Sequence, residues 1–313
     1  GLDSHQIRTW LLEWFNDLGV CFSYHQNETQ KTELASYKVL NPRWLTNAIY
    51  IVINAGKRYA DKGRMQLNLI QDLLGHSEFG VLKDVTYSEN ERDYVLDVMR
   101  KFNLSYAVSD DLEFIPALCD SETPAELHPI TYTKRISYQL KYPYLPDSVV
   151  HQLMIRCYKD LNPNKIWRKG LRIDIDCVGL SAVVDMGNDD STLQIDVYAN
   201  GMVEPWQLLH NIRKNISEIN KNLGLHAEDY IIIHSNDCDI SVTVNELFDA
   251  KEQGMSDLPI HNHVSRRWDR YIIDDLLGKT FGREIMEATF KKAEKSRKTI
   301  DILRFLLYIY IKL

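Results

Sequence analysis

The sequence lacks the cysteine pattern of a disulfide-stabilised or zinc-binding domain. Its five cysteines, at positions 21, 119, 157, 177 and 238, lie far apart and form no Cys-X-X-Cys pair. An odd number of scattered thiols is typical of a protein from a reducing compartment. We therefore expect a cytoplasmic protein that has neither structural zinc nor a disulfide framework.

The sequence also lacks an apolar run long enough to cross a membrane. A spanning helix needs about 20 apolar residues, whereas the most apolar stretch, residues 302–311, is short and contains Arg304. No apolar targeting segment precedes the first expected helix, residues 4–18. Gly1 resembles a tag remnant, which suggests a fragment of a longer protein.

An excess of positive charge is missing as well. The 313 residues contain 37 Lys and Arg against 44 Asp and Glu, a net charge of −7. Nucleic-acid binders and binders of anionic membranes carry basic surfaces, so both kinds of partner are disfavoured. The length and the 44% hydrophobic content predict a globular protein of two domains.

No complete nucleotide-binding or metal-binding motif is present. Gly278-Lys279-Thr280 resembles the end of a phosphate loop, but Ile273 stands where the first glycine is needed, and the preceding residues are expected to be helical. His261-Asn262-His263 is expected to lie in a loop between Pro259 and a helix around Trp268. Two loop histidines do not make a metal site.

Acidic residues are numerous in one region, but they do not form an active-site pattern. We expect them to line a solvated sheet face, and none has the spacing of a calcium loop; they are Asp174, Asp176, Asp185, Asp189, Asp190 and Asp196. The remaining histidines, including His210 and His234, stand alone without a nucleophile motif beside them. We therefore expect no catalytic residues, no metal and no cofactor in this chain.

Residues 1–123 are expected to form several helices followed by a β-hairpin, the order of a winged-helix domain. Asn41 is a suitable N-cap and Pro42 a suitable first helical residue. Ser88 and Glu91 form a capping box at the start of a helix over 88–102. These residues contain 12 Lys and Arg against 18 Asp and Glu, which argues against phosphate binding.

After a linker over 120–129, residues 130–258 alternate in the manner of an antiparallel sheet with helices on one face, giving an α+β fold overall. We expect helices over 147–161 and 205–223 among the strands. Residues 259–313 are expected to form a helical, basic, amphipathic tail. Such a tail can bind a membrane or a partner, or dock on its own domain or on a symmetry mate.

Four short motifs containing proline, aromatic residues or both follow one another along the chain. They are Leu40-Asn-Pro-Arg-Trp-Leu45, Phe114-Ile-Pro116, Tyr142-Pro-Tyr-Leu-Pro146 and Trp167-Arg-Lys-Gly170. In this order they are similar to the motifs of the COR domain, the module C-terminal to the Ras-like GTPase domain (Roc) of Roco proteins. The resemblance covers about residues 5–250.

The resemblance implies a signalling module that does no chemistry itself and couples homodimerisation to the cycle of the GTPase domain. GTP or GDP and Mg²⁺ would bind only to that domain, upstream in the parent protein, which can also carry leucine-rich repeats. It implies that Tyr144 lies near the GTPase domain, with Arg43 and Tyr142 as further candidates. The dimer surface would fall within residues 147–250, with Trp167, Arg168, Trp206 and Arg213 as candidates.

Two hypotheses follow for the function of the chain. The first is this dimerising regulator of a GTPase domain, with no nucleic-acid partner and no membrane contact. The alternative is a winged-helix nucleic-acid-binding regulator, which the acidic composition of residues 1–123 opposes.

Overall fold

In a computed structural model, the chain forms two compact units. The first comprises Gly1–Pro124, Val150–Tyr158 and Ile166–Lys169, and the second the remaining residues. The structure describes residues 22–23, 38–39, 41–82, 85–125, 132–176, 179–187, 189, 191–234, 238–262, 264 and 266–281. The helix expected over 4–18 and most of the expected C-terminal tail lie outside these residues.

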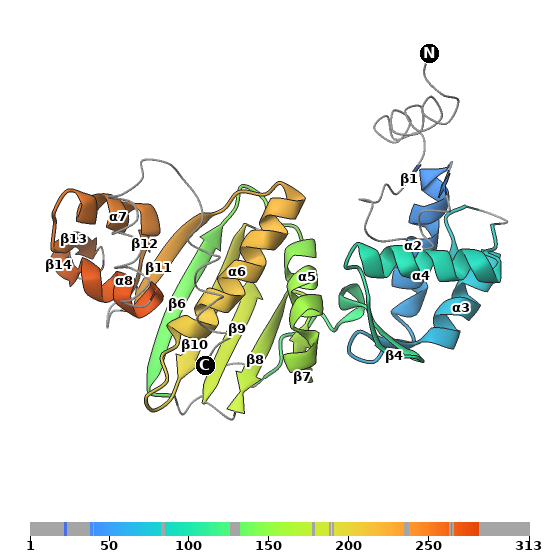
Figure 1. Cartoon of the computed structure of the whole chain (residues 1–313), viewed down its shortest axis with the longest axis horizontal. Coiled ribbons are helices and arrows are strands. Elements are labelled where there is room, and N and C mark those ends of the chain that lie inside the picture. Colours follow the sequence, from blue (N-terminus) through green and yellow to red (C-terminus); the bar gives the residue numbers. More distant parts are fainter. Residues whose placement is uncertain are drawn as a thin grey trace, which may run out of the picture. The chain divides into compact units, whose positions relative to one another are not determined.

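Within the described residues, the part of the first unit before the linker combines α-helices with short antiparallel strands (Figure 1). Its elements are β1 (Phe22–Ser23), β2 (Lys38–Val39), α2 (Pro42–Gly56), β3 (Arg64–Gln66), α3 (Leu67–Gly75), α4 (Glu89–Lys101), β4 (Tyr106–Ser109) and β5 (Leu112–Phe114). The hairpin β4–β5 was predicted, but β3 was not. With β3 paired to β5, the hairpin becomes a sheet of strand order β3-β5-β4.

Both predicted helix starts are confirmed. The Asn41 side chain accepts a hydrogen bond from the Arg43 N–H at 3.1 Å, and Pro42 is the first residue of α2. At α4 the Ser88 N–H donates to the Glu91 carboxylate at 2.8 Å. At α2 the Asn41 side chain pairs with a backbone N–H that the helix itself leaves unpaired. At α4 the Glu91 side chain binds the N–H of Ser88, the residue before the helix.

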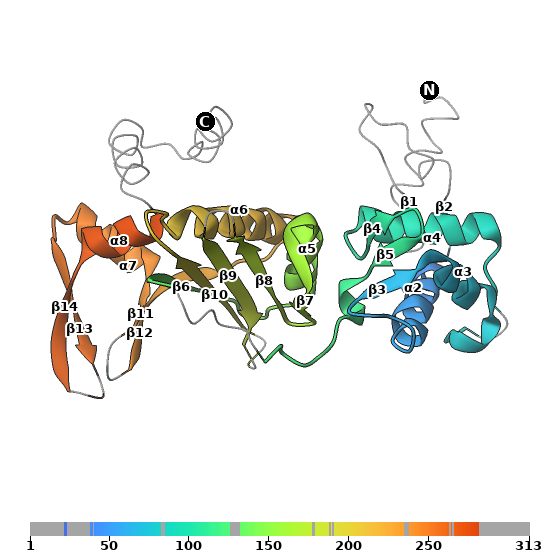
Figure 2. The ribbon, with the colours of Figure 1, turned by 90° about the horizontal axis from the view of Figure 1, so that it is seen from below.

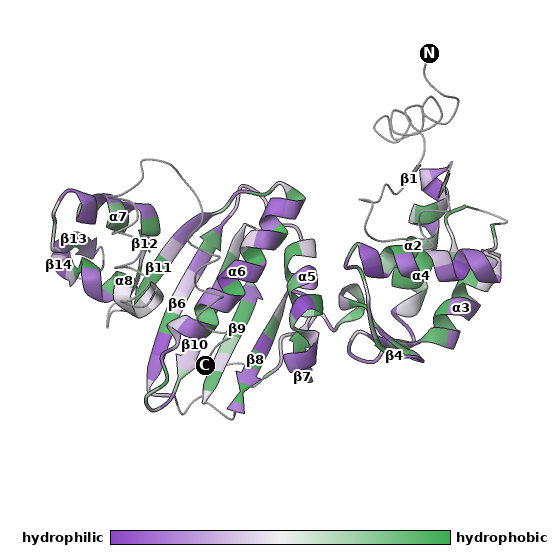
Figure 3. Ribbon diagram, in the orientation of Figure 1, coloured by the Kyte–Doolittle hydropathy of each residue, from purple (hydrophilic) through white to green (hydrophobic). Residues whose placement is uncertain are grey.

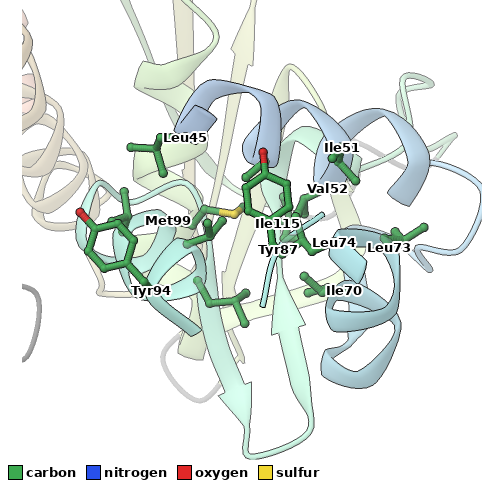
Figure 4. Close-up of a cluster of buried hydrophobic side chains, with 14 of the residues drawn as sticks. Leu45, Ile51, Val52, Ile70, Leu73, Leu74, Tyr87, Tyr94, Met99 and Ile115 are labelled. Atoms are coloured by element: carbon green, nitrogen blue, oxygen red, sulfur yellow. The ribbon is translucent and has the colours of Figure 1, made fainter. Parts of the chain in front are cut away.

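The core of the first unit lies where α2, α3 and α4 meet (Figure 4). On α2 it is centred on Leu45, Ala48, Ile51 and Val52, whereas Trp44 is only partly buried. The buried side of α2 also contains a polar residue, Asn47, which is 4% exposed.

Asn47 is held in the core by hydrogen bonds to three groups. Its Oδ1 accepts from the N–H groups of Val81 at 2.7 Å and Leu82 at 3.0 Å, and its Nδ2 donates to the Tyr87 hydroxyl at 3.0 Å. That hydroxyl in turn donates to the Trp44 carbonyl at 2.8 Å. Because buried polar groups are costly unless paired, Asn47 ties the loop before α4 to α2.

We predict that Asn47→Ala destabilises the chain by about 2–3 kcal/mol, because it leaves the N–H groups of Val81 and Leu82 without their acceptor and opens a small cavity in the core. Urea unfolding measures the change. Asn54→Ala, an exposed asparagine on the same helix, is the matched control and should cost less than about 1 kcal/mol. Equal losses for the two variants would contradict the role of Asn47.

The second unit is built on a seven-stranded sheet of order β12-β11-β6-β10-β9-β8-β7. The elements from this part of the sequence are β6 (Lys134–Lys141), α5 (Ser148–Cys157), β7 (Leu161–Trp167), β8 (Gly170–Ile175), β9 (Leu180–Met186), β10 (Thr192–Ala199), α6 (Trp206–Leu223), β11 (Glu228–His234), β12 (Asp239–Thr243), α7 (Val244–Glu252), β13 (Asp257–Asn262), β14 (Arg267–Ile272) and α8 (Ile273–Phe281). Helix α6 packs on β9 and β10 (Figure 2). The antiparallel α+β plan is confirmed.

Three local predictions in this region are wrong. The helix expected over 147–161 ends at Cys157, because residues 161–167 form β7. The helix expected around Trp268, and the loop expected for His261 and Asn262, are instead the antiparallel ribbon β13–β14, in which His261 faces Trp268. The helix after the ribbon begins only at Ile273 and contains Gly278-Lys279-Thr280, which therefore form no phosphate loop.

Hydrophilic and hydrophobic residues both occur along the strands of the sheet (Figure 3), and strand pairing shows which of them share a face. Ile195 pairs with Tyr138 on β6 and Val184 on β9, and these buried side chains share the face that α6 covers. Their neighbours Ser137 and Asp196 pair on the opposite face. Strand alternation thus separates an apolar face from a polar one.

The expectation of solvated aspartates on the polar face is wrong for two of the six. Asp176 and Asp189 are exposed and Asp185 is half-buried, whereas Asp190 lies outside the described residues. The Asp196 residue is only 5% exposed and the Asp174 side chain 10%. Carboxylates shielded to this extent require ion pairs or hydrogen bonds.

Candidate interaction surfaces

A groove of about 380 Å³ lies in the second unit between α6 and the start of β11. We call it the α6–β11 groove; it is lined by Leu140, Arg213, Ile216, Ser217, Asn220, Lys221, Leu225, His226, Ala227 and Asp229. Its lining mixes apolar side chains with an arginine, a lysine and a histidine against a single carboxylate. Such a surface suits an acidic or hydrogen-bonding partner group.

The floor of the α6–β11 groove is a small charged cluster. The Arg213 guanidinium lies 4.6 Å from the centre of the Tyr138 ring and 3.5 Å from the Asp229 carboxylate. The Tyr138 hydroxyl donates to the same carboxylate. Burial raises the pKa of Tyr138 well above its usual value. Arg213 therefore keeps a cation at the groove while its charge is partly balanced from below.

Tyr142 closes the cluster on the side of Asn220. Its ring is 5% exposed, and its hydroxyl lies 3.0 Å from the Asn220 Nδ2, which donates to it. Burial raises the pKa of Tyr142 to about 12, although the hydrogen bond from Asn220 acts in the opposite direction. The structure thus brings together Tyr142 and Arg213, which were assigned from the sequence to two different surfaces.

The other candidate residues differ in how far they reach solvent. Arg43 is exposed in the first turn of α2, and Tyr144 is 67% exposed. Trp206 is half-buried at the start of α6. Trp167 is 1% exposed, so it offers no surface to a partner without rearrangement. Arg168 is half-buried, and its backbone N–H donates to the Asp120 carbonyl at 2.7 Å.

The polar face of the sheet contains a row of side chains that sequence reasoning missed. The Ser137 Oγ lies 2.6 Å from His234 Nε2, and His234 Nδ1 lies 2.7 Å from the Asp239 carboxylate. Ser137 and His234 are 97 positions apart, so only the pairing of β6 with β11 brings them together. The order Ser–His–Asp is that of a hydrolytic triad.

Two features make this row unsuitable for nucleophilic catalysis. Ser137 is 1% exposed, in the middle of a strand, so a substrate carbonyl cannot reach its hydroxyl. The hydroxyl also donates to Asp196, which competes with His234 for its single proton. Asp196 in turn accepts from Arg135 at 3.0 Å. The row therefore joins three strands as a structural network.

Asp174 is the centre of a second network on the polar face. It accepts from Arg172 at 2.9 Å, from Ser181 at 2.7 Å and from Lys165. Burial by itself raises the pKa of Asp174, but the hydrogen bonds from Lys165, Ser181 and Arg172 outweigh burial and lower it. The charged form is thus stabilised in the folded state.

The described residues include neither a metal-binding cluster nor a helix that could span a membrane. Within the described ranges, no cluster of three His, Cys, Asp or Glu side chains could hold a metal ion. No helix among the same residues is both long and apolar enough to span a bilayer. Cys119 is a buried thiol, and burial raises its pKa to about 12.

Comparisons with known proteins identify the family. The model described as "C-terminal of Roc, COR-A domain" matches residues 1–120, and the model described as "C-terminal of Roc, COR-B domain" matches residues 133–279. Together they account for most of the chain. The chain belongs to the COR family. The resemblance found in the sequence motifs is thereby confirmed, and neither matched model is a catalytic family.

Two proteins similar to this chain carry both Roc and COR in their names. A Roc-COR-CHAT protease from an unknown prokaryotic organism is 24% identical over 174 residues, which are 53% of this chain and 15% of that protein. The structure of Methanosarcina barkeri Roco2 RocCORdC bound to GDP is 24% identical, with a TM-score of 0.30. That match covers 38% of this chain and 34% of the other. The COR chain thus spans a minor part of either relative.

The raised pKa of Tyr142 predicts that the COR chain loses stability at alkaline pH. Its folded pKa of about 12 exceeds the ordinary value of 10.0, so above pH 10 the unfolded state releases the proton first. Stability therefore falls as pH rises from 10 to 12. We expect Tyr142→Phe to make this fall shallower, measured by urea unfolding at each pH. Tyr50→Phe, at an exposed tyrosine, should leave the slope unchanged, and equal slopes for all three proteins would contradict the prediction.

The lowered pKa of Asp174 predicts that the COR chain loses stability at acid pH. Because its folded pKa is lowered from 3.8, its contribution is present above that value and is lost as pH falls further. We expect Asp174→Asn to lower the free energy of unfolding by about 2 kcal/mol at pH 7, a figure that already allows for partial solvent screening of the charges. The difference from wild type should shrink below pH 4. Asp176→Asn, at an exposed position, is the control; a pH-independent cost for Asp174→Asn would argue against an ionic role.

Proposed function

We propose that this chain is a non-catalytic regulatory module that couples homodimerisation to the GTPase cycle of an adjacent Roc domain. The observation that carries the proposal is the succession of COR-A and COR-B matches along one chain, both named for their position C-terminal of Roc. In this proposal GTP or GDP and Mg²⁺ bind to the Roc domain alone. The module would act in cytoplasmic signalling, and the parent protein can carry leucine-rich repeats.

The α6–β11 groove is proposed as the surface that receives the Roc domain. Arg213 supplies a guanidinium that Tyr138 and Asp229 hold in place. The exposed Lys221 and His226 add positive or hydrogen-bonding groups beside it. An acidic side chain of the partner would gain charge-assisted hydrogen bonds there. Arg213 thus moves from the proposed dimer surface to the GTPase-facing groove. Exposed Tyr144, two positions after Tyr142, is proposed to extend this surface, and exposed Arg43, on the first unit, is proposed as a separate contact with the Roc domain.

The homodimer is proposed to form through residues 147–250, with Arg168 and Trp206 at its surface. Aromatic and arginine side chains are enriched among the residues that contribute most to binding at interface centres. Trp167 would support this surface from within, since its side chain is buried.

The winged-helix order supports one alternative function, nucleic-acid binding. The sequence α2, β3, α3, α4, β4, β5 has three helices and a three-stranded sheet in that order. However, α4, the helix that would read DNA, carries Glu89 and Glu91 in its first turn, and Arg100 and Lys101 lie at its other end, in the last turn. Salt-dependent DNA binding in a shift assay would favour the alternative.

The groove makes a direct prediction for Roc binding. Ser217→Trp places a bulky ring at an exposed position that lines the groove. We expect it to weaken binding of the parent protein's separately produced Roc domain about tenfold or more, equivalent to about 1.4 kcal/mol. Glu218→Trp, at an exposed neighbour outside the groove lining, is the control and should bind normally, as measured by calorimetry.

The oligomeric state and nucleotide binding test the function as a whole. Light scattering over a concentration series should show a dimer or a monomer–dimer equilibrium, and fluorescent GDP should not bind this chain alone. A strictly monomeric state with and without Roc, or tight GTP binding by the chain, would overturn the proposed function.

A further inference from the structure

One face of the ribbon β13–β14 exposes two large apolar side chains, Trp268 and Ile272, to solvent. Strand pairing places Pro259 opposite Arg270, His261 opposite Trp268 and Asp257 opposite Ile272, so these side chains share a face. Trp268 is 67% exposed and Ile272 56% exposed. We call this face, made by Pro259, His261, Trp268, Arg270 and Ile272, the outer face of the ribbon.

The opposite face of the ribbon is turned toward the protein. Asn262 is 1% exposed there and lies 3.4 Å from the Cys238 thiol, while Leu258 and Tyr271 are half-buried. Figure 2 shows the ribbon projecting beside β11 and β12. The ribbon is therefore packed on one side only.

A two-stranded ribbon that packs on one side only gains stability when another element packs on its open side. Two strands alone are marginally stable in water, and a further layer is usually required. Trp268 has an edge-on contact with His261, with ring centres 5.2 Å apart, which leaves most of its indole in solvent. A large exposed aromatic surface beside an exposed isoleucine is typical of a docking surface.

We propose that the C-terminal segment of the same chain, residues 282–313, packs on the outer face of the ribbon. Helix α8 follows Ile272 directly, packs on β14 and ends at Phe281, so the segment begins close to the ribbon. Its 32 residues could span about 48 Å even if fully helical, whereas a six-residue strand spans about 20 Å. The segment thus has both the position and the length to cover the face.

The composition of the segment fits the outer face. Apolar residues recur through it and become dense at its end; they include Ile285, Phe290, Ile300, Leu303, Leu307 and Ile309. Burying such residues together with Trp268 and Ile272 would contribute about 25 cal/mol for each Å² removed from water. The proposal concerns only this packing and does not depend on the proposed function.

Charge also favours this occupant. The segment contains eight Lys and Arg against four Asp and Glu. The helices beside the base of the ribbon, α7 and α8, expose Glu246, Asp249, Glu252 and Asp274. These acids would attract a basic segment and repel an anionic membrane. In the ribbon itself, Arg270 is balanced by Asp257 at 3.0 Å.

Hydroxyl-radical footprinting of the full chain tests the packing through the oxidation of Trp268. In the variant Leu303→Asp/Leu307→Asp the apolar contact is removed, and we expect Trp268 to oxidise several-fold faster than in wild type. Ser296→Asp/Thr299→Asp changes the charge of the same segment equally and should keep Trp268 protected. Trp167, which is 1% exposed, reports that each variant is folded.

A second measurement needs no variant. Zero-length cross-linking of wild-type chains, mixed from ¹⁴N and ¹⁵N preparations, should join lysines of the segment, such as Lys292 or Lys295, to Asp257 or Asp274 within one isotope. Cross-links between isotopes would show that a second copy covers the face and would overturn the proposal. Equal oxidation of Trp268 in wild type and Leu303→Asp/Leu307→Asp, or an absence of these cross-links, would overturn it as well.

Discussion

Strand β6 sets the chemistry of the second unit, because it lies between β10 and β11 and its alternation points consecutive residues to opposite faces. Tyr138 faces the helices and meets Arg213 and Asp229 at the floor of the groove. Ser137, the preceding residue, faces the other way and meets Asp196 and His234. A shift of register by one residue would exchange these two environments, burying Ser137 in the apolar core and exposing Tyr138. The ladder to β10, in which eight residues of each strand pair, makes such a shift costly.

The polar face of the sheet and the groove differ in the hydrogen-bonding groups that they leave available to a partner. On the polar face, Asp174 and Asp196 are already surrounded by cations and hydroxyl groups. Their hydrogen-bonding capacity is spent inside the protein, so they stabilise the sheet and offer little to a ligand. At the groove, Lys221 and His226 stay at an exposed rim above the balanced Arg213. Side chains that can still form hydrogen bonds with a partner thus lie at the groove, which is why we propose that the partner binds there.

Features decided within a few neighbouring residues could be predicted from the sequence. The Asn41–Pro42 start of α2 and the Ser88–Glu91 start of α4 depend on side chains that bond to the adjacent backbone. The strands β6, β8, β9 and β10 were found because an apolar residue stands at every second position. In contrast, β3 has only three residues, too few to show a period. The ribbon was missed because Pro259 argues against a strand, and it is tolerated there because a proline can sit where its missing N–H breaks no ladder bond.

The candidate site was less accessible to sequence reasoning, because its contacts join distant positions. Tyr142 and Asn220 are 78 residues apart, and Ser137 and Asp196 are 59 apart. No local pattern encodes such pairs, and a shielded aspartate on a strand looks the same in sequence as a solvated one. The order of the motifs was informative where spacing was not, since it pointed to a family that the matched models then established. The same reasoning explains why Tyr142 and Trp167 were taken for surface contacts: an aromatic residue beside proline or glycine suits an interface and a core equally well, and only burial separates the two.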